Sequence, residues 1–211
     1  MIARRKIVVA IGATALTAPL ASFAQQPAKV ARIGFLGTAS AAGYAGQVEA
    51  FRAGLRDFGH IEDKNIVIEF RWAENKYARV PELAAELVRK KVDVIVTHGA
   101  LAVRAVREAS TTIPIVMAQA GDPVALGLVA SLARPGGNIT GLTQFQAEIS
   151  AKRLELLREV MPRIRQMAVL INPANPANAP NLRAMESTAA SLKMALQLFE
   201  VKGPSEFEGA F

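Results

Sequence analysis

Short apolar runs alternate with segments of helical periodicity along most of this chain, and this alternation constrains the fold more than any other feature. Residues 92–96 and 113–117 are runs rich in β-branched residues and bounded by turn residues, which predicts central strands buried on both faces. Residues 66–72 alternate apolar and polar side chains, which predicts a strand at the edge of the sheet. Residues 31–36 and 139–142 are predicted to be the first and last strands of the same sheet.

Helical segments separate these predicted strands. Val48, Phe51, Leu55 and Phe58 recur at steps of three and four residues, which predicts one apolar helix stripe that ends at Gly59. Further helices are predicted around Pro81, Leu83, Leu87 and Val88, over residues 101–109 and over residues 123–132. A chain that alternates strands and helices in this way is α/β with a doubly wound parallel sheet, and the edge character of the second strand gives the order 2-1-3-4-5.

After Thr143 the alternation starts again, which predicts a second α/β lobe. Its predicted elements are a helix marked by Ile149, Arg153, Leu156, Leu157 and Val160, a buried strand over residues 167–171, a loop over residues 172–176, a helix marked by Leu182, Met185, Ala189 and Leu192, and a strand over residues 195–201. Ser205 and Glu208 have the spacing of a capping box, which predicts the start of another helix close to the end of the chain.

Two parallel strands do not make an independent lobe, and this decides the expected domain organisation. We expect residues 25–145 to form the N-terminal lobe and residues 146–211 to form an incomplete C-terminal lobe. The chain is therefore expected to be a fragment or a truncated product. A frayed natural C-terminus is the alternative.

The first residues have the three parts of an export signal. Arg4, Arg5 and Lys6 form a positive segment, residues 7–20 carry no charge, and Ser22 and Ala24 are small residues suited to cleavage after Ala24. The apolar part is shorter than the roughly 20 residues that span a membrane. We expect residues 1–24 to be a signal peptide, read by either the Sec or the twin-arginine route, and the mature protein to be periplasmic.

The composition argues against several classes of function. Without the three basic residues of the predicted signal, 22 Lys and Arg stand against 18 Asp and Glu, and the basic residues are scattered rather than clustered as in nucleic-acid-binding proteins. The chain has no G-x-S-x-G elbow, no phosphate-binding G-x-x-x-x-G-K-S/T loop and no G-x-G-x-x-G fingerprint. His60 and His98 are its only histidines and it has no cysteine, so no metal, cofactor or catalytic residue is expected.

Small and polar residues follow three of the predicted strands. Residues 37–40, 97–100 and 119–122 all lie where a parallel strand leads into a helix, and the helix starts present unpaired N–H groups that suit an anion. The candidate ligand-binding residues in these loops are Thr38, Ser40, Thr97, Gly99, Gln119 and Asp122. Each also has a purely structural interpretation, because Ser, Thr and Asp are common helix caps and Gly is common in loops.

Several segments together resemble one known family. Residues 121–124 (GDPV) and 127–141 (GLVASLARPGGNITG) are similar to the signature of ABC transporter substrate-binding proteins of the tryptophan/tyrosine type. The resemblance extends to residues 68–74 (IEFRWAE), 81–88 (PELAAELV), 92–96 (VDVIV) and 172–176 (NPANP). It covers nearly all of the chain after the predicted signal.

The resemblance implies a type I-like periplasmic-binding fold with two lobes hinged around a cleft. It implies a small ligand, such as an aromatic amino acid, and an ABC permease in the inner membrane as the partner. By motif position it adds Thr143 at the crossing between lobes and Asn172 in the second lobe to the candidate ligand contacts. Members of the family are longer than this chain, which puts closure of the cleft in doubt here.

Two other functions stay open at this stage. A periplasmic sensor would bind its ligand in the same way and signal to a different partner. A periplasmic enzyme would need a nucleophile and a base in the cleft, for which the sequence offers no pair. A cytosolic repressor core shares the fold, but the predicted export signal argues against it.

Overall fold

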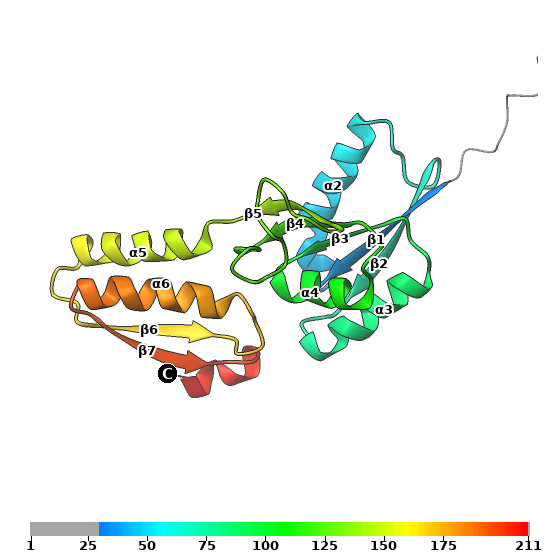
Figure 1. The fold of residues 1–211 in the computed structure, drawn as a ribbon. Coiled ribbons are helices and arrows are strands. Elements are labelled where there is room, and N and C mark those ends of the chain that lie inside the picture. The colour runs from blue at the N-terminus through cyan, green and yellow to red at the C-terminus, as the bar shows by residue number, and fades with distance from the viewer. Residues whose placement is uncertain (1–29, 211) are drawn as a thin grey trace, which may run out of the picture. The chain divides into compact units, whose positions relative to one another are not determined.

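A computed structural model describes residues 30–210 of the chain, which contain two separate parallel sheets (Figure 1). The predicted signal peptide, residues 1–24, lies outside the described residues. Within the described part, no helix combines the length and the apolar character needed to cross a membrane.

The first sheet has five parallel strands: β1 (Ala31–Gly37), β2 (Ile66–Trp72), β3 (Val94–His98), β4 (Ile115–Ala120) and β5 (Ile139–Thr143). Their order is β2-β1-β3-β4-β5, which confirms the predicted order. β3 and β4 begin two residues later than the apolar runs predicted. The edge position of β2 explains its alternating sequence, because an edge strand leaves more of one face accessible.

Helices cover both faces of this sheet (Figure 1). A short 3₁₀ helix, η2 (Ala42–Tyr44), leads into α2 (Ala45–Asp57) on one face, and η3 (Tyr77–Arg79), α3 (Val80–Arg89) and α4 (Ala100–Ala109) cover the other. Each face has its own hydrophobic cluster. The predicted residues Leu83 and Leu87 are buried in α3, and Pro81 lies in its first turn.

The end of α2 explains one error in the predicted stripe. Gly59 has φ +78°, and its N–H bonds to Arg56 O while the His60 N–H bonds to Leu55 O. These two bonds form a Schellman motif, as Gly59 predicted. The motif ends the helix before Phe58 can reach the core, so this ring is 84% exposed and is wrongly placed in the apolar stripe.

The predicted helix over residues 123–132 is wrong, because this segment forms consecutive turns. Pro123 O accepts the N–H groups of both Leu128 and Val129. Gly127, which precedes Leu128, has φ +63°, a value that an α-helix does not allow. Arg107 of α4 donates to Gly127 O. Leu128 and Val129 are buried in this turn segment, whereas Val124 and Leu132 are exposed.

The second sheet pairs β6 (Gln166–Ile171) with β7 (Ala195–Glu200) in parallel. α5 (Gln146–Val160) packs on α6 (Asn178–Ser191), and their shared cluster buries Leu154, Ala189 and Met194. β6 was predicted to be a buried strand, but its residues alternate between exposed and partly buried. The described residues supply one hydrophobic cluster here, where the first sheet has two, so part of each element stays accessible.

In the second sheet region, α5 confirms the helix predicted from Ile149 to Val160. Within it, Val160 is 79% exposed and Leu156 is 49% exposed. The predicted helix start at Ser205 is wrong. The capping-box sequence does not open an α-helix: residues 204–206 and 208–210 form two short 3₁₀ helices, η4 (Pro204–Glu206) and η5 (Glu208–Ala210). The Glu206 carboxylate instead accepts the N–H of Lys202 at 2.8 Å.

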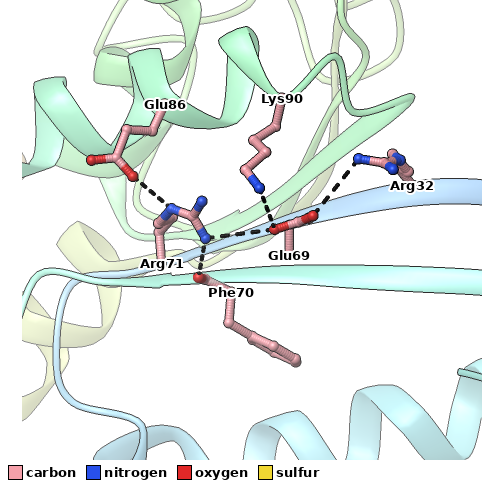
Figure 2. Close-up of polar contacts among 6 residues, drawn as sticks. All are labelled: Arg32, Glu69, Phe70, Arg71, Glu86 and Lys90. Atoms are coloured by element: carbon pink, nitrogen blue, oxygen red, sulfur yellow. Dashed lines mark hydrogen bonds and ion pairs between the residues drawn. The ribbon is translucent and has the colours of Figure 1, made fainter. Parts of the chain in front are cut away.

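A network of ion pairs links the edge strand β2 to β1 and to α3 and the segment after it (Figure 2). The Glu69 carboxylate lies 3.7 Å from Arg71, 3.8 Å from Lys90 on the segment after α3, and 3.8 Å from Arg32 on β1. Arg71 also pairs with Glu86 of α3, with Nε 2.7 Å from Oε2. Because Glu69 and Arg71 are only about one-fifth exposed, water screens these charges less than it screens fully exposed pairs.

Substitution of Gly141 tests the close approach of β5 to β4. Gly141 has φ +136°, and a Cβ there would overlap the carbonyl oxygen of Met117. We expect Gly141→Ala to lower the free energy of unfolding by more than about 2 kcal/mol. Gly54→Ala is the control, since Gly54 lies inside α2 with open space around it, and it should stabilise by about 0.5–1 kcal/mol. Urea unfolding followed by circular dichroism measures both.

Substitution of Glu69 tests the network of ion pairs. Glu69→Gln should cost about 1 kcal/mol of stability, because it leaves three cations around a neutral side chain, and the loss should shrink in high salt. The matched control is Glu49→Gln, which removes one exposed pair with Arg56 and should have no measurable effect. An equal loss for the two variants would contradict a special role for Glu69.

Candidate functional site

A polar hollow of about 230 Å³ lies at the carboxyl ends of β3 and β4. Parallel strands all end at the same edge of their sheet, so the loops that follow them meet there. The residues that line the hollow, here called the rim pocket, are His98, Gly99, Ala100, Gln119, Ala120, Gly121, Gln144, Gln146, Asn175, Ala177 and Asn181.

The rim pocket is rich in hydrogen-bonding groups. Five of its residues are amides, and none is Asp, Glu, Lys or Arg. Three helices start beside it, since α4 begins at Ala100, α5 at Gln146 and α6 at Asn178. The first N–H groups of a helix lack intrahelical partners and carry partial positive charge. Such a pocket suits a ligand with a carboxylate or another strong acceptor.

A line of hydrogen bonds runs into the rim pocket from the end of β1. Thr38 Oγ1 lies 3.1 Å from Tyr44 Oη, and Tyr44 Oη lies 3.3 Å from His98 Nδ1. His98 Nε2 lies 3.1 Å from Gln119 Oε1. Together, these four side chains form the rim relay. It joins the segment after β1 to the carboxyl ends of β3 and β4.

A cluster of aromatic rings packs against the Tyr44 ring of the relay. The Tyr44 ring stacks on Trp72 with centroids 5.6 Å apart, and Phe35 meets Trp72 at 5.4 Å. Trp72 fits because Gly37 has no side chain, since a Cβ there would overlap the indole ring. Phe70, which lies on the side of β2 away from Glu69 (Figure 2), stacks on Trp72 at 5.5 Å. The cluster fixes the position of the Tyr44 hydroxyl.

The structure brings three of the predicted site residues to the rim pocket or the relay. Gly99 and Gln119 line the pocket, and the Gly99 N–H donates to Gln119 O at 2.8 Å. Thr38 is the outer end of the relay. Ser40 lies in the same loop as Thr38, where its hydroxyl accepts the N–H of Gly43 at 3.1 Å, so it supports the start of η2.

The other four predicted residues lie away from the rim pocket or are occupied by the chain itself. Thr97 is fully buried and donates its hydroxyl to Leu36 O at 2.9 Å. Asp122 Oδ1 accepts the N–H groups of Val124 and Ala125, both at 3.0 Å. The Thr97 hydroxyl and Asp122 Oδ1 are thus engaged with the backbone, which agrees with the structural interpretation of these two residues.

Thr143 and Asn172 are also engaged within the chain. Thr143 Oγ1 donates to Gly121 O at 3.2 Å. Asn172 Oδ1 accepts the N–H of Ala174 at 3.0 Å, and Asn172 Nδ2 donates to Lys202 O at 3.2 Å. Neither residue lines the rim pocket.

Sequence reasoning missed most of the amides in the rim pocket. Gln144 and Gln146 precede and begin α5, and Asn175 lies in the loop over residues 172–176 that had been singled out for a different asparagine. Their position just before a helix start was the available signal. Tyr44 gave none, because a tyrosine after a glycine-rich loop has no distinctive pattern.

A second hollow, of about 300 Å³, lies beside the edge strand and α2 and differs in character. Its lining is mostly apolar and includes Val48, Phe70 and Trp72. The only charge in its lining is that of Arg52, whose guanidinium lies 5.2 Å from the centroid of the Phe70 ring. A hydrogen bond to Glu62 raises the pKa of Arg52 above its already high ordinary value. One α-helix, α2, starts at this hollow, and the hollow has few polar groups, so the rim pocket is the better candidate site.

Comparison with known families and proteins gives a consistent result. Residues 33–211 match the family described as ABC transporter substrate binding protein. The chain is 33% identical over 124 residues to the "Tyrosine-binding protein" of Clostridioides difficile (strain R20291), a match that covers 59% of this chain and 35% of that protein.

Solved structures share the fold. A conserved domain protein from Vibrio cholerae superposes with a TM-score of 0.79 at 25% identity, over 86% of this chain and 61% of that one. The ABC domain in complex with L-Trp from Streptococcus pneumonia gives 0.76 at 23% identity, over 85% and 60%. The chain thus spans less than two thirds of the length of each of these relatives.

Substitution of Asp122 separates its capping role from a binding role. Asp122→Ala should lower the free energy of unfolding by about 1 kcal/mol, because two N–H groups lose their acceptor. Asp122→Asn keeps the acceptor oxygen and should be nearly neutral. Thermal unfolding of the two variants distinguishes them, and an equal loss in both would show that the negative charge, rather than the cap, is what the structure needs.

Proposed function

Because the chain belongs to the ABC transporter substrate-binding protein family, we propose that it is the solute-binding component of an ABC importer and that the rim pocket holds the solute. We propose further that the solute is an aromatic amino acid. The support for this class is the tyrosine-binding relative and the structural neighbour crystallised with L-Trp.

One observation carries the proposal: three helix starts meet around a pocket whose lining contains no Asp, Glu, Lys or Arg. In this arrangement the start of α4 at Ala100 holds the carboxylate of the amino acid through backbone N–H groups. The side-chain amide oxygens of Gln146 and Asn181 accept hydrogen bonds from the ammonium group of the amino acid. Gly99 and Gln119 remain candidate contacts, and the absence of a side chain at Gly99 lets a ligand approach the backbone.

The proposed cycle needs no covalent chemistry. Residues 25–145 and 146–211 act as the two hinged lobes, and the ligand favours the closed form by contacting both. The closed form then docks on a permease in the inner membrane. Residues 1–24 direct the protein to the periplasm, where the solute is captured.

A thermal-shift titration tests the proposal. L-Tyrosine and L-tryptophan, each supplied at about 100 times the dissociation constant, should raise the melting temperature by about 5–10 °C. Ala177→Trp should abolish the shift, because Ala177 lines the rim pocket and an indole would fill it. Ala190→Trp is the matched control, since Ala190 is exposed in α6, the helix that Ala177 precedes, and it should keep the shift.

Two results would contradict the proposal. The first is an equal ligand-induced shift in Ala177→Trp and the parent protein, which would place the ligand elsewhere. The second is the absence of any shift together with turnover of a chromogenic ester, which would favour an enzyme.

A further inference from the structure

The rim relay fixes which end of the Gln119 carboxamide faces the pocket. We infer that His98 is a positioning residue that holds Gln119 Oε1 and so turns the Gln119 NH₂ group toward the ligand, which makes the pocket selective for an acceptor such as a carboxylate. The selectivity rests on the proposed solute-binding function. The orientation of Gln119 does not depend on it.

The hydrogen bonds of the relay have one consistent direction. His98 Nε2 faces the carbonyl oxygen of Gln119 at 3.1 Å, so Nε2 carries the proton and donates. In the neutral ring Nδ1 then has a lone pair, and it accepts from the Tyr44 hydroxyl at 3.3 Å. The Tyr44 oxygen in turn accepts from the Thr38 hydroxyl at 3.1 Å. Every donor in the line meets an acceptor.

The same orientation of Gln119 holds when the histidine is charged. Both ring nitrogens of a protonated His98 donate, so Nε2 still requires the Gln119 oxygen. The Tyr44 oxygen then accepts from Nδ1, and its proton turns to Thr38. A flipped Gln119, with its nitrogen toward His98, is compatible only with the opposite neutral tautomer. The observed orientation is therefore the one that both charge states of the ring share.

The surroundings restrict movement of the relay. The Tyr44 ring stacks on Trp72 and meets His98 edge-on with centroids 5.8 Å apart. At the other end, the backbone of Gln119 is fixed because its carbonyl accepts the Gly99 N–H. Gln119 is thus held at both its main chain and its side chain before a ligand arrives.

The consequence is a pair of fixed donors in the rim pocket. Among residues 30–210, no hydrogen bond uses Gln119 Nε2, so its two protons are available to a ligand. Asn175 is arranged in the same way, since its Oδ1 accepts the Ala177 N–H at 3.0 Å and its NH₂ group remains. The NH₂ groups of Gln119 and Asn175 lie beside the start of α4. Together they recognise a hydrogen-bond acceptor on the ligand and disfavour a cation at that position.

The tautomer of His98 tests the orientation without any ligand. Protein labelled with ¹⁵N-histidine has only two ring systems to assign, His60 and His98, and His60→Asn leaves the signals of His98 alone. We expect a protonated Nε2 and an unprotonated Nδ1 at a pH where the ring is neutral. A predominant Nδ1-protonated form would overturn the inference, whatever the protein binds.

Binding of two matched probes tests the selectivity. L-Tyrosine and tyramine differ only in the carboxylate, and calorimetry should show much tighter binding of L-tyrosine. Gln119→Glu replaces the two donors with an anion and should weaken L-tyrosine binding by roughly 100-fold, with little effect on tyramine. Unchanged affinity of Gln119→Glu for L-tyrosine would overturn the inference.

Two substitutions of His98 test whether it acts through Gln119. His98→Phe keeps a ring but frees the carboxamide to flip, and it should weaken L-tyrosine binding by about tenfold. His98→Gln places an N–H where Nε2 was and should restore binding to within about threefold. Equal losses in the two variants would contradict a positioning role. If the tautomer is as expected but neither probe binds, the aromatic-amino-acid proposal fails and the acceptor selectivity with it.

Discussion

Backbone hydrogen bonding among five parallel strands is the constraint on which the rest of this structure depends. Parallel neighbours need a crossover between them, so all strands begin on one side of the sheet and all their carboxyl ends lie on the opposite side. The segments after β1, β3 and β4 therefore meet at one rim. That is why Gly99 and Gln119, which are 20 residues apart in sequence, share a hydrogen bond and a pocket.

The polar groups at this rim divide into two kinds, and the division explains how the site can work. Thr97 and Asp122 have their polar atoms committed to the backbone, so they hold the loops in place. Among residues 30–210, the side chains of Gln119 and Asn175 form hydrogen bonds only through their oxygens, which leaves their nitrogens for the proposed ligand. The rings of Tyr44 and Trp72 keep this arrangement rigid at little cost in side-chain entropy on binding. These fixed donors suit the proposed capture of a solute, which needs no covalent chemistry.

The sequence predicted the strands well because the packing they require is local and repetitive. Continuous apolar runs marked β3 and β4, and alternation marked β2 as an edge, which was enough to give the strand order. Prediction failed where one residue overrides a pattern. Gly127 turns an apolar segment into consecutive turns, and Gly59 ends α2 before Phe58 can pack. In the second sheet region, helical periodicity was correct for α5 and α6, but it did not predict how much of each would be covered.

The sequence by itself determined the α/β class, the order of the first sheet, the family and the rim on which polar residues gather. Only the tertiary structure decided which of those residues face the pocket. The reason is that a polar side chain bonds to whichever partner the fold brings near, and that partner is often distant in the chain. Thr97 forms a hydrogen bond with Leu36 O, which is 61 residues away in sequence, and His98 forms one with Gln119, which is 21 residues away. The periodicity of a sequence predicts which face of a strand or helix is buried, but it does not predict which distant residue will bond to a polar side chain.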